Sequence, residues 1–380
     1  MFLGWICKKI HFPSLFGMIV TGILLGPYVL NQIDTSILEI SADLRRIALI
    51  IILTRAGLSL NVGDLKKVGR PAVLMCFLPA CFEMIGMVVL APVLLGINRL
   101  DAAIMGAVIA AVSPAVVVPK MLKLMEEGYG VKQGIPQLIL AGASVDDVFV
   151  IVMFTAFTGL AQGGAISPIR FLQVPVSIFS GILVGVFIGW IMAIYFEKIH
   201  IRDTAKVMIL LCISFILVTM EDWYSHIIPF SGLIAIMGMG IALQKKRIVV
   251  AERLSAKYSK LWVVAEVMLF VLVGATVDLN YAFAAGINTI FLIFGVLIFR
   301  MAGVFCCVLK TKLNWKERLF CMVGYLPKAT VQAAIGGTPL AMGLACGNIV
   351  LTVAVVAILI TAPLGAFCIE WTYKKLLSQD

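Results

Sequence analysis

Apolar residues dominate the chain in long stretches, and short polar loops separate one stretch from the next. A helix needs about 20 mostly apolar residues to cross the hydrocarbon core of a membrane. The hydrophobic pattern predicts about twelve such spans. They cover residues 12–30, 46–60, 71–96, 101–124, 135–161, 170–196, 205–220, 228–243, 258–278, 282–309, 317–345 and 349–372.

A shorter apolar piece, Phe2 to Cys7, precedes the first predicted span and is too short to cross a membrane. It has no small-residue cleavage site of the kind that ends a signal peptide. Two interpretations remain open. The piece is either an interfacial start or the end of a thirteenth helix of which this chain holds only a part.

Composition supports the membrane interpretation. Hydrophobic residues make up 62% of the chain, charged residues only 13%, and the mean hydropathy is +1.09. No soluble domain of this length needs so much apolar surface, so we expect an all-α, polytopic membrane protein. The cysteines lack CxxC spacing, which argues against a disulfide framework or a zinc site.

The net charge of +10 does not indicate a nucleic-acid partner, because the basic residues mark loops rather than one face. Most of the 30 Lys and Arg residues fall in every second loop, and the loops on the other side hold only Arg45, Arg46, Arg99 and Arg170. Cytoplasmic loops carry the excess of Lys and Arg. This distribution predicts that both chain ends lie in the cytoplasm, and we expect a multi-pass protein of the plasma membrane.

Two of the predicted spans contain helix breakers. The fourth span contains Pro114 and Pro119, and the eleventh contains Pro327 followed by Gly336-Gly337. A broken helix at membrane depth is tolerated only where it faces protein or a water-filled cavity.

Each broken span is the middle one of a three-span unit, spans 3–5 and spans 10–12, and the two units start from opposite sides of the membrane. We therefore predict an inverted repeat in which two broken helices cross at the binding site. The alternative is that prolines are simply common in membrane helices.

Asp146 and Asp147 lie side by side in the fifth span, IPQLILAGASVDDVFVIVMFTAFTGLA. A carboxylate in hydrocarbon costs several kcal/mol, and two adjacent carboxylates resist joint ionisation. We interpret the pair as a site that holds either a proton or a cation such as Na⁺. Neighbouring helical residues point about 100° apart, so one aspartate can face a basic partner while the other lines a cavity.

Glu83, Arg300 and Lys328 are also charged residues well inside predicted spans. An unpaired guanidinium would be strongly unfavourable there, so we expect Arg300 to pair with Glu83, either as a structural bridge or as part of transport. Arg300 keeps its proton and cannot carry one across. Lys328 lies beside a proline break, where a low-dielectric cavity can make a lysine give up its proton. We expect Lys328 to pair with one of the two aspartates.

The segments AVSPAVVVPKMLKLMEEGYGVKQGIPQLILAGASVDDVFVI and YLPKATVQAAIGG resemble the monovalent cation:proton antiporter superfamily. The likeness is greatest to its sodium/proton antiporter branch, which includes mammalian exchangers. The opening FPSLFGMIVTGILLGP is similar to the first helices of that family, and the resemblance extends over nearly the whole chain.

The resemblance implies particular site residues. By position, Asp147 matches the family's cation- and proton-binding aspartate, and Asp146 matches its companion. Ser113 and Pro114 match the unwound part of the broken helix, whose carbonyls and hydroxyls help to form the ion cavity.

By the same resemblance, Arg300 matches the basic residue of the family's tenth core helix. Glu83 matches the residue that forms an ion pair with it. Many electrogenic relatives carry lysine where this chain has Arg300. If only Asp147 cycles a proton, we expect one-for-one, electroneutral exchange.

The family's architecture implies a core domain, residues 71–161 and 282–372, that translocates the ion. It would move in an elevator-like cycle against panel, dimerisation and linker helices in residues 1–66 and 170–278. The resemblance thus implies a homodimer, with monovalent cations, protons and the lipid bilayer as the protein's other partners.

The leading hypothesis is therefore secondary active transport, in which Na⁺ or Li⁺ and H⁺ compete for Asp147. Alternatives are a K⁺/H⁺ exchanger, or an ion-coupled symporter or channel on the same scaffold. An intramembrane aspartyl protease needs two carboxylates that converge on one water, and neighbours on one helix diverge, so we do not expect an enzyme. The transported ions are expected to serve in place of any cofactor, and no GxxxxGK[ST] motif for ATP is present.

Overall fold

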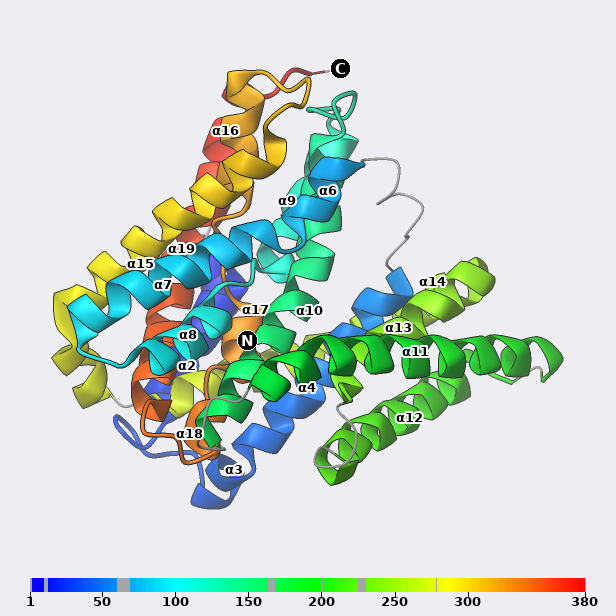
Figure 1. Cartoon of the computed structure of the whole chain (residues 1–380), viewed down its shortest axis with the longest axis horizontal. Helices are drawn as coiled ribbons and strands as arrows, with labels where there is room; N and C mark the ends of the chain where they lie inside the picture. The colour runs from blue at the N-terminus through cyan, green and yellow to red at the C-terminus, as the bar shows by residue number, and fades with distance from the viewer. Residues whose placement is uncertain are drawn as a thin grey trace. The chain divides into compact units, whose positions relative to one another are not determined.

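The computed structural model describes residues 2–9, 13–59, 69–162, 168–199, 201–224, 230–277 and 279–379. These residues are almost entirely helical (Figure 1), and their one isolated β-bridge joins Tyr129 to Gln379. The predicted all-α class is confirmed.

The internal contacts divide the chain into two compact units. Unit 1 comprises residues 1–45, 64–162 and 267–380, and unit 2 comprises residues 46–63 and 163–266. Two helices belong to both units, because α4 (Ser41–Ser59) and α14 (Ile248–Ala275) run across the boundaries.

Unit 2 is built around α11 (Pro168–Lys198), α12 (Asp203–Tyr224) and α13 (Gly232–Lys246), with the adjoining parts of α4 and α14. Helices α11 and α13 lie against each other through glycines four residues apart on α11. A Cβ atom at Gly185 would overlap the carbonyl oxygen of Ala235, and one at Gly189 would overlap that of Met239. Small residues at this spacing let two membrane helices approach backbone to backbone.

Unit 1 contains both predicted three-span units. The first consists of α6 (Arg70–Met75), α7 (Leu78–Leu95), α8 (Arg99–Ile109), α9 (Pro114–Glu126) and α10 (Ile135–Gln162). The second consists of α15 (Leu279–Val308), α16 (Trp315–Gly324), α17 (Thr330–Ile335), α18 (Thr338–Ala341) and α19 (Gly347–Leu376). The short helices α1 (Phe2–Lys9), α2 (Ser14–Leu25) and α3 (Thr35–Glu39) complete the unit.

The middle span of each three-span unit is interrupted, as the sequence predicted. Residues 110–113 are non-helical between α8 and α9, and Pro114 is the first residue of α9, where a proline's missing N–H costs nothing. The chain is non-helical again at residues 326–329, around Pro327, and a turn at Gly336-Gly337 separates α17 from α18.

Two details differ from the prediction. Helix α9 continues through Pro119, which therefore does not break it, because one missing hydrogen bond is tolerated inside a packed membrane helix. The third predicted span has a turn at Cys76-Phe77, just before Pro79, which separates α6 from α7.

Within the described residues, eight helices are long and apolar enough to cross a membrane. They confirm a multi-pass membrane protein. The other predicted spans fall on the shorter, interrupted or more polar helices α2, α4, α13 and α16–α18, so the total of about twelve remains a prediction.

Candidate functional site

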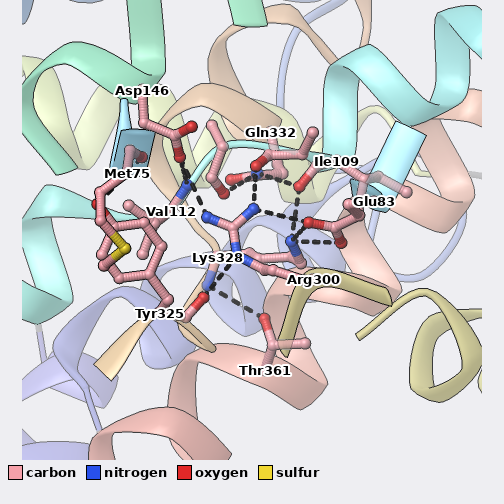
Figure 2. Close-up of polar contacts among 12 residues, drawn as sticks. Met75, Glu83, Ile109, Val112, Asp146, Arg300, Tyr325, Lys328, Gln332 and Thr361 are labelled. Atoms are coloured by element: carbon pink, nitrogen blue, oxygen red, sulfur yellow. Dashed lines mark hydrogen bonds and ion pairs between the residues drawn. The ribbon is translucent and has the colours of Figure 1, made fainter. Parts of the chain in front are cut away.

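Arg300 is the centre of a buried polar cluster in unit 1 (Figure 2), and none of its surface is exposed. Its Nε donates to the carbonyl oxygen of Tyr325 over 2.7 Å, and Nη1 donates to Glu83 Oε2 over 2.7 Å and to the carbonyl of Ala110. Its Nη2 donates to Asp146 Oδ2 over 3.1 Å. The guanidinium thus joins two carboxylates to the ends of two broken helices, and the expected ion pair of Arg300 with Glu83 is present.

Lys328 binds the same glutamate. Its Nζ lies 2.6 Å from Glu83 Oε1 and 2.7 Å from Oε2, and it also donates to the carbonyl of Ile109 over 2.8 Å. The predicted pairing of Lys328 with an aspartate is therefore wrong. Arg300 reaches Asp146 instead, because its guanidinium presents several donors in a fork and can serve two carboxylates at once.

The two interruptions meet directly through the backbone. The N–H of Ser113 donates to the carbonyl of Pro327 over 2.8 Å, and the N–H of Lys328 donates to the hydroxyl of Thr361 over 3.1 Å. These bonds satisfy backbone groups that the unwound segments leave without helical partners. The crossing predicted from the repeat is thus present as a hydrogen-bonded contact.

Helix ends account for the electrostatics of the crossing. The carbonyls of Ile109 and Ala110 at the end of α8, together with that of Tyr325 after α16, face the cationic side chains of Lys328 and Arg300. The C-terminal end of a helix carries partial negative charge, which favours cations. The N–H of Val112, just before α9, donates to Asp146 Oδ2 over 2.9 Å, so the start of that helix favours the carboxylate.

Several buried oxygen atoms in this part of unit 1 have no hydrogen-bond donor, and Asp146 Oδ1, Asp147 Oδ1 and Ser113 Oγ are among them. Ser113 occupies the N-cap position of α9, yet its side chain does not cap the helix. Buried oxygens almost always have a partner. Carboxylate and hydroxyl oxygens left in this way are hard ligands of the kind that suit Na⁺.

The two aspartates have different surroundings. Asp146 is fully buried against Arg300, whereas Asp147 is 7% exposed and forms no ion pair with any residue that the structure describes. This difference follows from the helical offset between neighbours on α10. One carboxylate is balanced by Arg300, and the other has no ion pair among the described residues.

Gln332 was not singled out from the sequence. Its Nε2 donates to the carbonyls of Ile109 and Ala111, and the side chain is 1% exposed. An amide one helical turn after Lys328, in an otherwise apolar segment, was the available signal. Over the described ranges, no three His, Cys, Asp or Glu side chains gather as a resident metal site would require.

The chain as a whole matches a known family. The family model described as "Sodium/hydrogen exchanger, transmembrane" matches residues 1–375. The chain therefore belongs to the transmembrane sodium/hydrogen exchanger family, as the sequence resemblance indicated.

Two curated relatives are sodium/hydrogen exchanger 9B2 from Mus musculus and from Homo sapiens. Each is 33% identical to this chain over 97% of its length. The matched region spans 69% of the mouse protein and 70% of the human protein. Among solved structures, the sodium proton antiporter MjNhaP1 from Methanocaldococcus jannaschii at pH 8 has a TM-score of 0.87. The match covers 99% of this chain and 95% of the MjNhaP1 chain at 20% sequence identity, which shows a shared fold.

Proposed function

We propose that the protein exchanges Na⁺ for H⁺ across the membrane, and that Asp147 binds both ions in turn. The observation that carries the proposal is the buried carboxylate of Asp147, which has no ion pair among the described residues and follows directly after Asp146, a residue that contacts the crossing of the broken helices. Intramembrane carboxylates that protein charges do not balance are typical of ion and proton pathways. Family membership supports the same reaction.

In this mechanism Na⁺ displaces the proton from Asp147 and gains oxygen ligands from Asp146 and Ser113. Asp146 Oδ2 is occupied by Arg300 and Val112, so only its Oδ1 remains to face the cation. Ser113 contributes Oγ while its backbone N–H stays engaged with Pro327. A proton or a sodium ion then satisfies the same carboxylate, but both cannot do so together.

We propose an elevator-type movement in which residues 71–161 and 282–372 carry the site, and in which a homodimer forms through the panel, residues 1–66 and 170–278. Every side chain of the cluster belongs to unit 1, which supports movement of the site as one body. The short contacts among Arg300, Glu83 and Lys328 would hold the cluster together during that movement. The transported ions are the only non-protein groups that this mechanism uses.

We place the protein in the plasma membrane with both ends of this chain in the cytoplasm. The concentration of Lys and Arg in alternate loops supports this orientation. A Na⁺ gradient or a proton gradient across that membrane would supply the driving force.

The test is Na⁺ uptake into proteoliposomes under an imposed pH gradient, with and without valinomycin at equal K⁺ on both sides. We expect uptake by the native protein, no uptake by Asp147→Asn, and no effect of valinomycin, because one-for-one exchange moves no net charge. Asp203→Asn in unit 2 is the matched control and should exchange normally. Normal exchange by Asp147→Asn would refute the assignment, and native protein without uptake would refute the function.

A further inference from the structure

Gln332 lies where the two broken helices cross, and the hydrogen bonds described for its side chain go to the backbone of the opposite segment. Its Nε2 donates to the carbonyl of Ile109 over 2.9 Å and to that of Ala111 over 2.8 Å (Figure 2). Both neighbours are acceptors, so the amide must present its NH₂ group to them. This orientation leaves Gln332 Oε1 buried without a donor.

The three carbonyls at the end of α8 are held by three different side chains from the second half of unit 1. Lys328 and Gln332 donate to the carbonyl of Ile109. Arg300 donates to that of Ala110, and Gln332 donates to that of Ala111. The carbonyl of Ala111 has one described hydrogen bond, and Gln332 donates it. Ala111 directly precedes Val112 and Ser113, which contact or belong to the candidate cation site.

A backbone carbonyl is itself a good ligand for an alkali cation, and the number of carbonyls around such an ion affects which ion is preferred. A neutral amide can hold two carbonyls away from the cation without adding charge to the cluster. A lysine or arginine in the same place would add a third cation beside Arg300 and Lys328.

We propose that Gln332 is a positioning residue that sets cation selectivity by keeping the Ala111 carbonyl out of the ion's coordination shell. The ion then meets side-chain oxygens of Ser113, Asp146 and Asp147 in fixed positions. This inference rests on the proposed function, because it assigns a role within the same transport site.

The test compares native protein with Gln332→Met, which keeps the side-chain length and removes both donors. Exchange is measured in proteoliposomes with Na⁺, Li⁺ and K⁺ in turn, and thermal stability is measured in detergent. We expect the ratio of the KM for Na⁺ to the KM for K⁺ to rise about tenfold, because the freed Ala111 carbonyl changes the coordination shell of the ion. The preference for Na⁺ and Li⁺ over K⁺ should narrow, with kcat changed less than KM, because a freed carbonyl adds a ligand that suits the larger ion.

Gln244→Met is the matched control, since Gln244 is a buried glutamine in unit 2. It should leave KM and ion preference unchanged. Gln332→Asn is a milder second variant that keeps an amide too short to reach both carbonyls, and it should shift the KM ratio in the same direction by a smaller factor.

The outcomes separate this inference from the function on which it rests. Native KM and native ion preference in both Gln332 variants would overturn the positioning role while leaving the exchange reaction intact. A fall in kcat and stability with no change in ion preference would also overturn it, since that is the result of a purely structural role. Native protein that carries no flux would instead remove the proposed function.

Discussion

The backbone N–H of Ser113 donates to the carbonyl oxygen of Pro327 over 2.8 Å, so the two interrupted helices of unit 1 are joined at their interruptions. The bond uses only main-chain atoms and therefore leaves the Ser113 hydroxyl free. It fixes the crossing without occupying the oxygen that the cation is proposed to use.

Ser113→Ala tests that separation of roles. The substitution removes Oγ and keeps the N–H bond to Pro327, so we expect thermal stability close to that of the native protein. The KM for Na⁺ should rise about tenfold, because the cation loses one oxygen ligand. Thr158→Ala removes another buried hydroxyl, one that donates to the carbonyl of Phe154, and serves as the control. Equal KM values in Ser113→Ala and native protein would exclude the hydroxyl as a ligand.

Glu83→Gln tests the cluster's charge balance. Within the part of the chain that the structure describes, Glu83 is the one carboxylate that binds both Arg300 and Lys328, so its loss leaves buried cations under-compensated. Breaking a buried pair in this way costs about 3–5 kcal/mol. We expect a large fall in the thermal midpoint measured in detergent.

Glu370→Gln provides the comparison for Glu83→Gln. Glu370 binds Lys120 and Lys123, yet its side chain is 37% exposed, and exposed pairs contribute about 1 kcal/mol or less. Similar losses of stability in the two variants would show that burial does not govern the cluster.

Competition between ions at Asp147 predicts a pH effect on Na⁺ affinity. If a proton and Na⁺ exclude each other there, acidification raises the apparent KM for Na⁺ and leaves the maximal rate little changed. The rise approaches about tenfold per pH unit once the proton dominates, because each unit multiplies the competing proton concentration by ten. Initial rates across a series of equal internal and external pH values provide the measurement. A KM that does not vary with pH would contradict shared binding.

Gly185→Leu tests the packing within unit 2. The added side chain would overlap the backbone of α13 at Ala235, so the two helices would have to separate. Overpacking of this kind costs about 1–3 kcal/mol or more. Gly159→Leu on α10 is the control, because a Cβ atom there meets nothing within 4 Å. A thermal midpoint that falls equally in both variants would argue against close packing at Gly185.

The sequence predicted the helices, their interruptions and the Arg300–Glu83 pair, but it did not predict the partner of Lys328. Hydrophobic stretches located the eight long apolar spans of the described residues, and Pro114 and Pro327 located the interruptions, because both signals are local to the chain. The partner of Lys328 depends on how α7, α10 and α15 pack laterally, and nothing in the local sequence encodes that. Burial explains why Glu83 and Arg300 paired as predicted, since each needed a counter-charge and each occurs in otherwise apolar sequence.

Gln332 is a buried residue of the crossing that the sequence did not single out. A glutamine in an apolar segment carries no formal charge, so it gave no signal comparable to that of Arg300. Its importance arises from two carbonyls that lie far from it in the sequence, at Ile109 and Ala111. Pro119 led to the opposite error. The proline predicted a break in the helix, but α9 continues through it.

The ion pairs at the crossing also bear on leakage. Two cations, Arg300 and Lys328, face two anions, Glu83 and Asp146, so this part of the site is electrically neutral. If Asp147 binds the ions as proposed, it decides the net charge: the site is neutral with a proton or a sodium ion bound, and negative when vacant. A vacant site would have to take that charge through hydrocarbon at a cost of several kcal/mol. In the proposed mechanism, this charge balance favours one-for-one exchange and disfavours the return of an empty carrier, which would dissipate the gradient without exchange.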